Sequence, residues 1–255
     1  MQTRIAVAQI TMHWTTRENV DTMLEALSIA RHHGAEICAF SELAVTGFHR
    51  EIAREALPEV VGPAVSELQA RCAELKIAAS IGAPTFSEGG RRLISQLLVD
   101  EHGHLSATVS KQGLTGPEAT FFERGTTRPV ARMQGLRCSA VICREVEDHE
   151  QVFAELPPGA VDLVFVPGAL RQDPEKPRSD PPEYVRNIQR LAKGTGAFVV
   201  QTNWPNALNR PEESVDGGES TVASPDGEVL LRLPKQSSGL GIFCLGERTF
   251  AWLAR

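Results

Sequence analysis

The chain has 255 residues, of which 42% are hydrophobic and 23% are charged, and its formal net charge is −6. A chain of this length can bury one large core, and no linker or shift in composition divides it, so we expect a single domain over residues 1–255. Acidic and basic residues are interspersed without a basic stripe, which argues against a nucleic-acid-binding protein.

The first segment and the cysteines indicate the cellular compartment of the protein. MQTRIAVAQITMHW alternates like a strand, and its apolar run is too short and too interrupted for a signal peptide or a membrane span. The cysteines are odd in number and have no CxxC pair, which disfavours a disulfide framework and a thiol-rich zinc site. They are Cys38, Cys72, Cys138, Cys143 and Cys244. We therefore expect a cytoplasmic protein that does not enter a membrane.

The first half of the chain predicts strands that alternate with helices, followed by a hairpin. Thr15 and Glu18 have the spacing of a capping box at the start of the first helix. The expected elements are a strand at 4–10, a helix at 15–33, a strand at 36–40, a helix at 63–76, a strand at 77–82 and a hairpin of strands at 93–100 and 105–111.

The second half predicts further strands and one helix. The expected elements are strands at 139–143 and 162–168, a helix at 182–196, a strand at 197–203, and a strand pair at 219–224 and 228–233. Strands that alternate with helices early and pair with each other later indicate an α/β protein with a mixed sheet. Segments 171–182 and 205–218 are rich in proline and charge, so we expect them to be long loops that border the site, with plain solvated connections as the alternative.

Three reactive residues each follow a segment that reads as a buried strand. Glu42 follows EICAF (36–40), Lys111 ends ATVSK (107–111), and Cys143 ends SAVIC (139–143). Because α/β proteins build active sites at the ends of their strands, we expect these side chains to meet at the ends of neighbouring strands.

This trio is a complete set for covalent acyl transfer. A thiol can attack a carbonyl, a carboxylate can move protons, and an ammonium can stabilise negative charge on oxygen. A free thiol with a pKa of about 8.5 is only partly ionised at neutral pH, so Cys143 needs a base or a cation nearby. The alternatives are a buried structural cysteine at Cys143 and a surface salt bridge at Glu42.

Three stretches of the chain resemble the nitrilase superfamily of carbon–nitrogen hydrolases. FSELAVTGF (40–48) is similar to the signature around that family's glutamate, SKQGLTGPEATFFERG (110–125) to the stretch around its lysine, and GLRCSAVICREVEDHE (135–150) to the strand and elbow that carry its cysteine. Similarity continues through LVFVPGA (163–169) and GGESTVASPDGEVL (217–230), so it covers nearly the whole chain.

The resemblance implies a fold and a set of roles. The fold is a four-layer α-β-β-α sandwich with mixed sheets. The resemblance makes Cys143 the nucleophile, Glu42 the proton carrier, and Lys111 with the backbone N–H of Arg144 the groups around the developing oxyanion. It also implies a second glutamate soon after the lysine, which is Glu118, with Glu123 as the competitor.

Departures from the family pattern concern the substrate more than the reaction. The segment after the thiol carries Arg144, Glu145, Asp148 and His149, so we expect an unusually charged pocket wall. Arg144 could bind a substrate carboxylate, or it could pair with Glu145 or Glu147.

Two residues at the end of the predicted strand at 197–203 complete the candidate pocket. We expect Asn203 and Trp204 to form part of the pocket wall. No His, Asp or Glu cluster has metal-ligand spacing and no glycine-rich phosphate loop is present, so we expect no metal and no cofactor.

We therefore predict a cofactor-free hydrolase that cleaves a non-peptide C–N bond of a small amide or N-carbamoyl compound through a cysteine thioester and releases ammonia or an amine. The alternatives are an acyltransferase or nitrile hydrolase that uses the same thioester, or a non-catalytic binding or scaffold protein with this fold. The resemblance implies at least a homodimer.

Overall fold

The computed structural model describes residues 2–170 and 179–254 and contains two β-sheets. The first sheet has seven strands in the order β13-β12-β1-β2-β3-β4-β5. These strands are β13 (Thr249–Ala254), β12 (Gly239–Cys244), β1 (Arg4–Gln9), β2 (Ile37–Ala39), β3 (Ala78–Phe86), β4 (Arg92–Val99) and β5 (Leu105–Ser110). Only β1, β2 and β3 are parallel to one another, and the other pairs are antiparallel.

The second sheet has six strands in the order β11-β10-β9-β8-β7-β6. They are β11 (Val229–Arg232), β10 (Thr221–Ala223), β9 (Phe198–Asn203), β8 (Leu163–Gly168), β7 (Leu136–Ala140) and β6 (Ala131–Met133). Its central strands β7, β8 and β9 are parallel, while β6, β10 and β11 pair antiparallel. Both sheets are therefore mixed.

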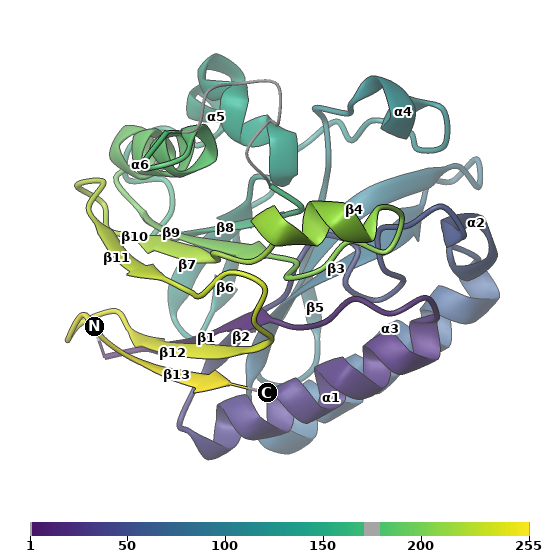
Figure 1. The fold of residues 1–255 in the computed structure, drawn as a ribbon, viewed down its shortest axis with the longest axis horizontal. Helices are drawn as coiled ribbons and strands as arrows, with labels where there is room; N and C mark the ends of the chain where they lie inside the picture. Colours follow the sequence, from purple (N-terminus) through teal and green to yellow (C-terminus); the bar gives the residue numbers. More distant parts are fainter. Residues whose placement is uncertain (1, 171–178, 255) are drawn as a thin grey trace.

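Helices cover the outer face of each sheet (Figure 1). Helices α1 (Thr16–His32) and α3 (Pro58–Leu75) lie side by side on the first sheet, and α5 (His149–Glu155) and α6 (Glu183–Thr195) cover the second. The remaining helices are short: α2 (Ile52–Glu55), α4 (Gly116–Ala119) and the 3₁₀ segments η1 (Cys143–Glu147) and η2 (Pro211–Asp216). This arrangement confirms the predicted four-layer α-β-β-α sandwich.

Three apolar clusters fill the spaces between the layers. The period of two in β1 sends Ile5 and Val7 into the cluster between the sheets, while Ala6 and Ala8 face the cluster under α1 and α3. A third cluster, which includes Val164 from β8, lies under α5 and α6. The central strands of each sheet, such as β1 and β8, are buried on both faces, which fixes their register.

The capping box predicted at the start of α1, from Thr15 and Glu18, is only partly formed. The Thr15 hydroxyl oxygen accepts a hydrogen bond from the Glu18 backbone N–H at 3.3 Å, as in a capping box. The Glu18 carboxylate, however, accepts from the Thr15 hydroxyl at 2.6 Å instead of the Thr15 backbone N–H. The box is therefore only half formed, because the Glu18 side chain bonds the cap hydroxyl.

Other predicted elements exist with different limits. Both predicted strand pairs are antiparallel hairpins, β4–β5 and β10–β11. The strand predicted at 139–143 is β7, which ends at Ala140, and the helix predicted at 63–76 is α3, which begins at Pro58. Proline is well tolerated in the first turn of a helix because its missing N–H would have no partner there. No helix within residues 2–170 and 179–254 is long and apolar enough to cross a membrane.

Candidate active site

Glu42, Lys111 and Cys143 come together, but not from neighbouring strands as predicted. Glu42 follows β2 and Lys111 follows β5, and β3 and β4 lie between those strands in the first sheet. Cys143 follows β7 in the second sheet. The site therefore forms where the ends of two facing sheets meet, and packing of the sheets against each other brings its members together.

Lys111 lies at the centre of the charged cluster. Its side chain is fully buried, and its Nζ donates to Glu42 Oε1 and to Glu118 Oε1, each at 2.7 Å. Burial opposes the charge on the ammonium, but Glu42, the Cys143 sulfur and Glu118 together raise the pKa of Lys111 above its ordinary value. Lys111 is therefore a cation at neutral pH.

The second glutamate at this cluster is Glu118 and not Glu123. Glu118 lies in α4, and its Oε2 accepts from the Thr115 backbone N–H at 2.8 Å, which closes a capping box. Glu123 lies in the loop beyond α4 and is exposed. Its backbone N–H donates to Arg92 O in β4. The capping box holds one oxygen of the Glu118 carboxylate while the other binds Lys111.

Glu42 is buried with one carboxylate oxygen still available. Its Oε1 accepts from Lys111, whereas no described residue makes a hydrogen bond to Oε2. Burial raises the pKa of Glu42 above its ordinary 4.5, and the Lys111 ammonium opposes that rise. The nearby Cys143 thiol also favours the ionised form. A carboxylate with a free oxygen and a raised pKa is suited to accept and return a proton.

The backbone around Glu42 is held in a strained form. Leu43 has a φ of 52°, which is unusual for a bulky residue. A Cβ at Gly82 in β3 would collide with the Ser41 carbonyl and lie 2.6 Å from the Leu43 N, so only glycine lets this loop approach the strand. The Val45 backbone N–H also donates to Gly82 O at 2.9 Å.

Cys143 lies at a sharp turn between β7 and η1. Its φ is 53°, and it is the only one of the five cysteines that is partly exposed as a residue, although its sulfur is desolvated. Burial and the Glu42 carboxylate raise the pKa of Cys143 to about 12, although the Lys111 ammonium acts in the opposite direction. The resting sulfur is therefore a thiol, and a reaction at this atom needs a base to take its proton.

Trp204 and Asn203 donate side-chain hydrogen bonds to backbone carbonyls around the site. The Trp204 side chain is buried, and its indole N–H donates to Glu42 O at 3.1 Å. Asn203 Nδ2 donates to Leu170 O at 2.6 Å and to Gly218 O at 2.7 Å. Both predicted wall residues thus hold the backbone around the site in place.

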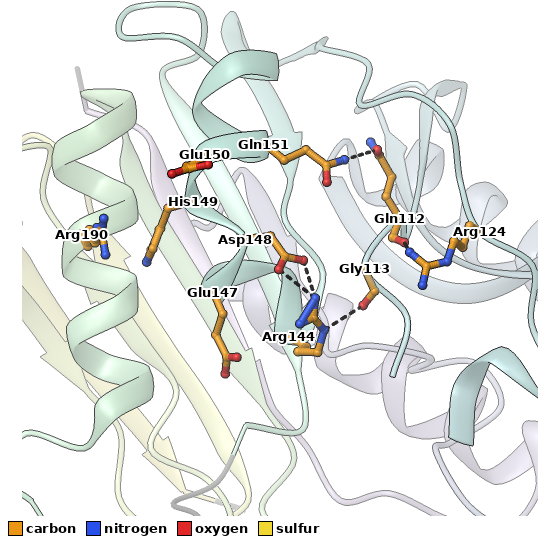
Figure 2. Close-up of a pocket in the computed structure, with 10 residues that line it drawn as sticks. All are labelled: Gln112, Gly113, Arg124, Arg144, Glu147, Asp148, His149, Glu150, Gln151 and Arg190. Atoms are coloured by element: carbon orange, nitrogen blue, oxygen red, sulfur yellow. Dashed lines mark hydrogen bonds and ion pairs between the residues drawn. The ribbon is translucent and has the colours of Figure 1, made fainter. Parts of the chain in front are cut away.

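Arg144 lines a surface pocket of about 590 Å³, whose lining does not include Cys143 (Figure 2). Its Nη2 donates to both carboxylate oxygens of Asp148, at 2.8 and 2.6 Å, and its Nε to Gly113 O at 3.3 Å. Arg144 therefore pairs with neither Glu145 nor Glu147. Its guanidinium is engaged with the protein, which weighs against a role in binding a substrate carboxylate.

Of the two predicted loops, 205–218 is described in full and 171–182 only from residue 179 onward. Residues 171–178 lie outside the part of the chain that the structure describes. In the second segment, Asn206 Oδ1 accepts from Met12 N at 2.8 Å and its Nδ2 donates to Met12 O at 3.0 Å. This pair of bonds fixes the start of 205–218 beside the end of β1.

Sequence reasoning missed one buried acid in this region. Glu145 is 1% exposed and bonds backbone N–H groups on both the lysine and the cysteine loops, whereas the sequence suggested only a pairing with Arg144. The available signal was its place two residues after the thiol. Within the described residues, no group of three or more His, Cys, Asp or Glu side chains could hold a metal ion.

Comparisons with known proteins agree with this geometry. A family model described as carbon-nitrogen hydrolase matches residues 4–245. The chain is similar in structure to a cysteine-to-alanine variant of the Nesterenkonia AN1 amidase, a member of the nitrilase superfamily. The TM-score is 0.82, with 28% identity over 96% of this chain and 90% of that one. A double variant of this amidase in complex with acrylamide gives a TM-score of 0.83 and 28% identity over 96% of this chain and 91% of that one.

Two further findings bear on the chemistry. A glutamate-to-glutamine variant of the Nesterenkonia amidase shows covalent addition of the acetamide moiety of fluoroacetamide at the active-site cysteine, and this structure has a TM-score of 0.81 and 27% identity over 99% of this chain and 90% of that one. The glutamine-dependent NAD(+) synthetase of Rhodobacter capsulatus is 23% identical over 226 residues, which is 85% of this chain and 38% of that protein. The chain thus spans well under half the length of this curated relative.

Proposed function

Because the chain belongs to the carbon–nitrogen hydrolase family of the nitrilase superfamily, we propose that it hydrolyses the C–N bond of a small amide through a thioester on Cys143. The observation that carries the proposal is the Lys111 ammonium, buried and bonded at 2.7 Å to both Glu42 and Glu118, beside a partly exposed thiol at a strained turn. Such a cluster is costly to bury, and a catalytic role explains why it is retained.

The first half of the reaction forms the thioester. The Cys143 sulfur attacks the amide carbonyl carbon while Glu42 takes the thiol proton, and the carbonyl oxygen becomes an oxyanion beside the Lys111 ammonium. When the oxyanion collapses, the C–N bond breaks and Glu42 gives the proton to the leaving nitrogen. Ammonia or an amine departs, and the acyl group remains on sulfur.

The second half releases the acid. A water molecule attacks the thioester carbonyl, and Glu42 takes one of its protons. The C–S bond then breaks, the carboxylic acid leaves, and the sulfur takes the proton back from Glu42. The carboxylate and the thiol are restored, so one glutamate serves both halves.

Lys111 supplies charge stabilisation rather than a proton. Its raised pKa keeps it protonated throughout, and each donor of this kind lowers the barrier by about 3–4 kcal/mol in acyl-transfer enzymes. Glu118 holds the ammonium at the oxyanion position while Glu42 changes its protonation state.

The comparisons support a primary amide as the substrate class. Acrylamide, butyramide and fluoroacetamide are named with structures of the Nesterenkonia amidase. The curated relative is named for its dependence on glutamine, whose side chain ends in a primary amide. We propose short aliphatic primary amides, with ammonia as the released product and no cofactor.

The test is ammonia release from a panel of aliphatic amides, N-carbamoyl amines and nitriles, with wild type, Cys143→Ala and the control Cys244→Ala. We expect release from the amides, none from Cys143→Ala, and normal rates from the control, because Cys244 is a buried strand cysteine. Mass spectrometry should find the acyl adduct on the peptide that contains Cys143. Turnover by Cys143→Ala, or an adduct on another cysteine, would overturn the proposal.

A further inference from the structure

Glu145 connects the two loops that carry the proposed lysine and nucleophile. Its Oε1 accepts from the backbone N–H groups of Gln112 at 2.6 Å and Gly113 at 3.1 Å, directly after Lys111. Its Oε2 accepts from the backbone N–H of Ile142 at 2.7 Å, directly before Cys143. One carboxylate thus bonds the main chain next to both reactive residues.

We propose that Glu145 is a positioning residue, which sets the distance between the Lys111 ammonium and the Cys143 sulfur. The inference rests on the proposed function above, because it concerns the geometry of that same site. Lys111 and Cys143 extend from different sheets, and no strand pairing joins β5 to β7. The Glu145 carboxylate supplies a direct link between those two strand ends.

Arg128 holds this carboxylate in place. Its Nη1 donates to Glu145 Oε2 at 3.1 Å and to Ala140 O at 2.5 Å, at the end of β7. Its Nε donates to Glu155 Oε2 at 2.7 Å, so α5 anchors the guanidinium in turn. Both Arg128 and Glu145 are buried, and an ion pair with this many bonds is rigid.

The bonding pattern requires an ionised carboxylate. Three backbone N–H groups and a guanidinium all donate to Glu145, so both of its oxygens must act as acceptors. Burial would raise the pKa of Glu145, but Arg128 and the backbone donors hold it below its ordinary value. Glutamine has nearly the same shape, but its NH₂ group must face donors at one end of this bridge.

A second contact between the same two loops lies on the outside (Figure 2). Arg144 donates to Gly113 O and is held by Asp148, while a Cβ at Gly113 would lie 2.5 Å from Asp148 Oδ2. The lysine loop is therefore packed closely against the cysteine elbow, and a small shift in one must move the other. Misplacement of reacting groups by about 1 Å can cost 10²-fold in rate.

The experiment compares Glu145→Gln with Asp162→Asn, its matched control. Asp162 makes a similar carboxylate bridge at the opposite end of β7, where it accepts from the backbone N–H of Arg137 at 2.8 Å and from its guanidinium at 2.7 Å. For each variant we would measure kcat and KM for a short amide, the rate of Cys143 alkylation by iodoacetamide, and the melting temperature. Arg128→Lys is the second variant, since lysine keeps the charge but cannot reach Glu145, Glu155 and Ala140 O together.

We expect Glu145→Gln to lower kcat about 10²-fold, with KM changed by less than about threefold, and to change the alkylation rate of Cys143. Arg128→Lys should lower kcat about tenfold by the same route, and it replaces Glu145→Gln as the decisive variant if the latter does not fold. Asp162→Asn should leave kcat and alkylation as in wild type, whatever it does to stability. Glu145→Asp should recover part of the loss, because it restores the charge.

Two results would overturn the inference. One is a kcat within about threefold of wild type in the decisive variant. The other is an equal loss in Asp162→Asn, which would reduce the effect to general stability. Either result leaves the proposed function intact as long as Cys143→Ala is inactive, whereas turnover by Cys143→Ala refutes the proposed function and with it this inference.

Discussion

At the scale of single residues, three charged groups share one buried site. Lys111 binds two carboxylates, so the cluster carries an excess of one negative charge when both are ionised. That excess and the burial of Glu42 favour its protonated form, which agrees with the raised pKa of that residue. A glutamate in this position can hold a proton between two steps of a reaction.

Glu42→Gln should keep the fold and stop catalysis. The amide has nearly the same shape and can still accept from Lys111, but it cannot take the thiol proton. We expect kcat to fall by about 10³-fold or more, which corresponds to ~4 kcal/mol in the barrier. The measurement is ammonia release from the best amide, with circular dichroism as the control for folding. Turnover within about tenfold of wild type would mean that Glu42 is not the base.

The pH profile should reflect the raised pKa of Glu42. The residue must be ionised to accept the thiol proton, so kcat/KM should fall as the pH drops through that pKa. Because burial raises the pKa, the acid limb should lie above 4.5, the ordinary value for glutamate. Rates on an uncharged amide across the acid range, at constant ionic strength, would measure it. An acid limb at or below the ordinary value would contradict this assignment.

Cys143 should be the first thiol to react in the folded protein. It alone of the five cysteines is partly exposed, and the others are buried. Its pKa of about 12 means that the thiolate fraction, and with it the alkylation rate, should rise with pH through the alkaline range. Iodoacetamide labelling followed by peptide mass spectrometry would rank the five sites. Faster labelling of Cys38 or Cys244 under native conditions would count against the nucleophile assignment.

Residue types and motifs were enough to predict that Glu42, Lys111, Cys143 and Glu118 lie together, but not which residues hold them in place. Glu145 bonds the backbone of Gln112 and Gly113, far away along the chain, and a sequence does not reveal which backbone a carboxylate reaches. Trp204 was predicted as a pocket wall because of its aromatic face, and the sequence did not reveal that its indole N–H donates to Glu42 O. These roles depend on contacts between the two sheets.

At the scale of elements, the site depends on how strands β2 and β7 end. The chain leaves β2 through a loop with Leu43 at positive φ, and it leaves β7 through Cys143 at positive φ. Both turns place strained non-glycine residues next to reactive groups, and such strain persists only where the surroundings enforce it. For the Glu42 loop, the close approach of Gly82 provides that enforcement.

Gly82→Ala should displace the Glu42 loop. Its methyl group would collide with the Ser41 carbonyl and crowd Leu43, and neither is a flexible side chain. We expect a loss of about 1–3 kcal/mol in the free energy of unfolding, together with a lower kcat. Chemical denaturation and amide turnover would measure the two effects.

Gly62→Ala is the matched control for that prediction. Gly62 lies in α3, and apart from its chain neighbours a Cβ added there would meet no atom within 4 Å, so alanine should leave kcat unchanged. Because Pro63 follows and disfavours a helical residue with a Cβ before it, no gain in stability is expected. Equal activity in the two variants would show that the approach of β3 does not hold Glu42.

Long periodic elements could be predicted from the sequence, and short ones could not. Helix α6 and strand β9 follow the expected segments closely. Strand β6 has only three residues, and α4 only four, so neither contains a full period of its pattern. The start of β7 at Leu136 was missed because Arg137 interrupts its apolar run.

At the scale of the whole molecule, the order of the strands within each sheet could not be predicted from the sequence. Strand β12, near the end of the described chain, pairs with β1 near its beginning, with Arg4 opposite Cys244. The two sheets then bury a shared apolar cluster, and their ends form the site. Pairing between distant segments depends on long-range packing, which periodicity does not report.

The face formed by α5, α6 and the elbow is where we expect a second copy of the chain to bind. Arg124, Arg144 and Arg190 lie around the surface pocket together with acidic residues of the elbow and α5 (Figure 2). A two-fold contact joins a patch to its own copy, so a patch with both charge signs can be self-complementary. Such a contact would also bury Arg144 and Gly113, which lie in the loops that carry Cys143 and Lys111.

Arg190→Glu should weaken that dimer. In a self-complementary contact Arg190 attracts the acidic residues of the other copy's face, and reversal of its charge turns this attraction into repulsion, which costs association energy. Light scattering coupled to size-exclusion chromatography should show a dimer for wild type and a shift toward monomer for the variant. Arg31→Glu is the control, because Arg31 is exposed in the last turn of α1 on the opposite outer layer. A monomeric wild type, or an equal shift in both variants, would exclude this face as the dimer contact.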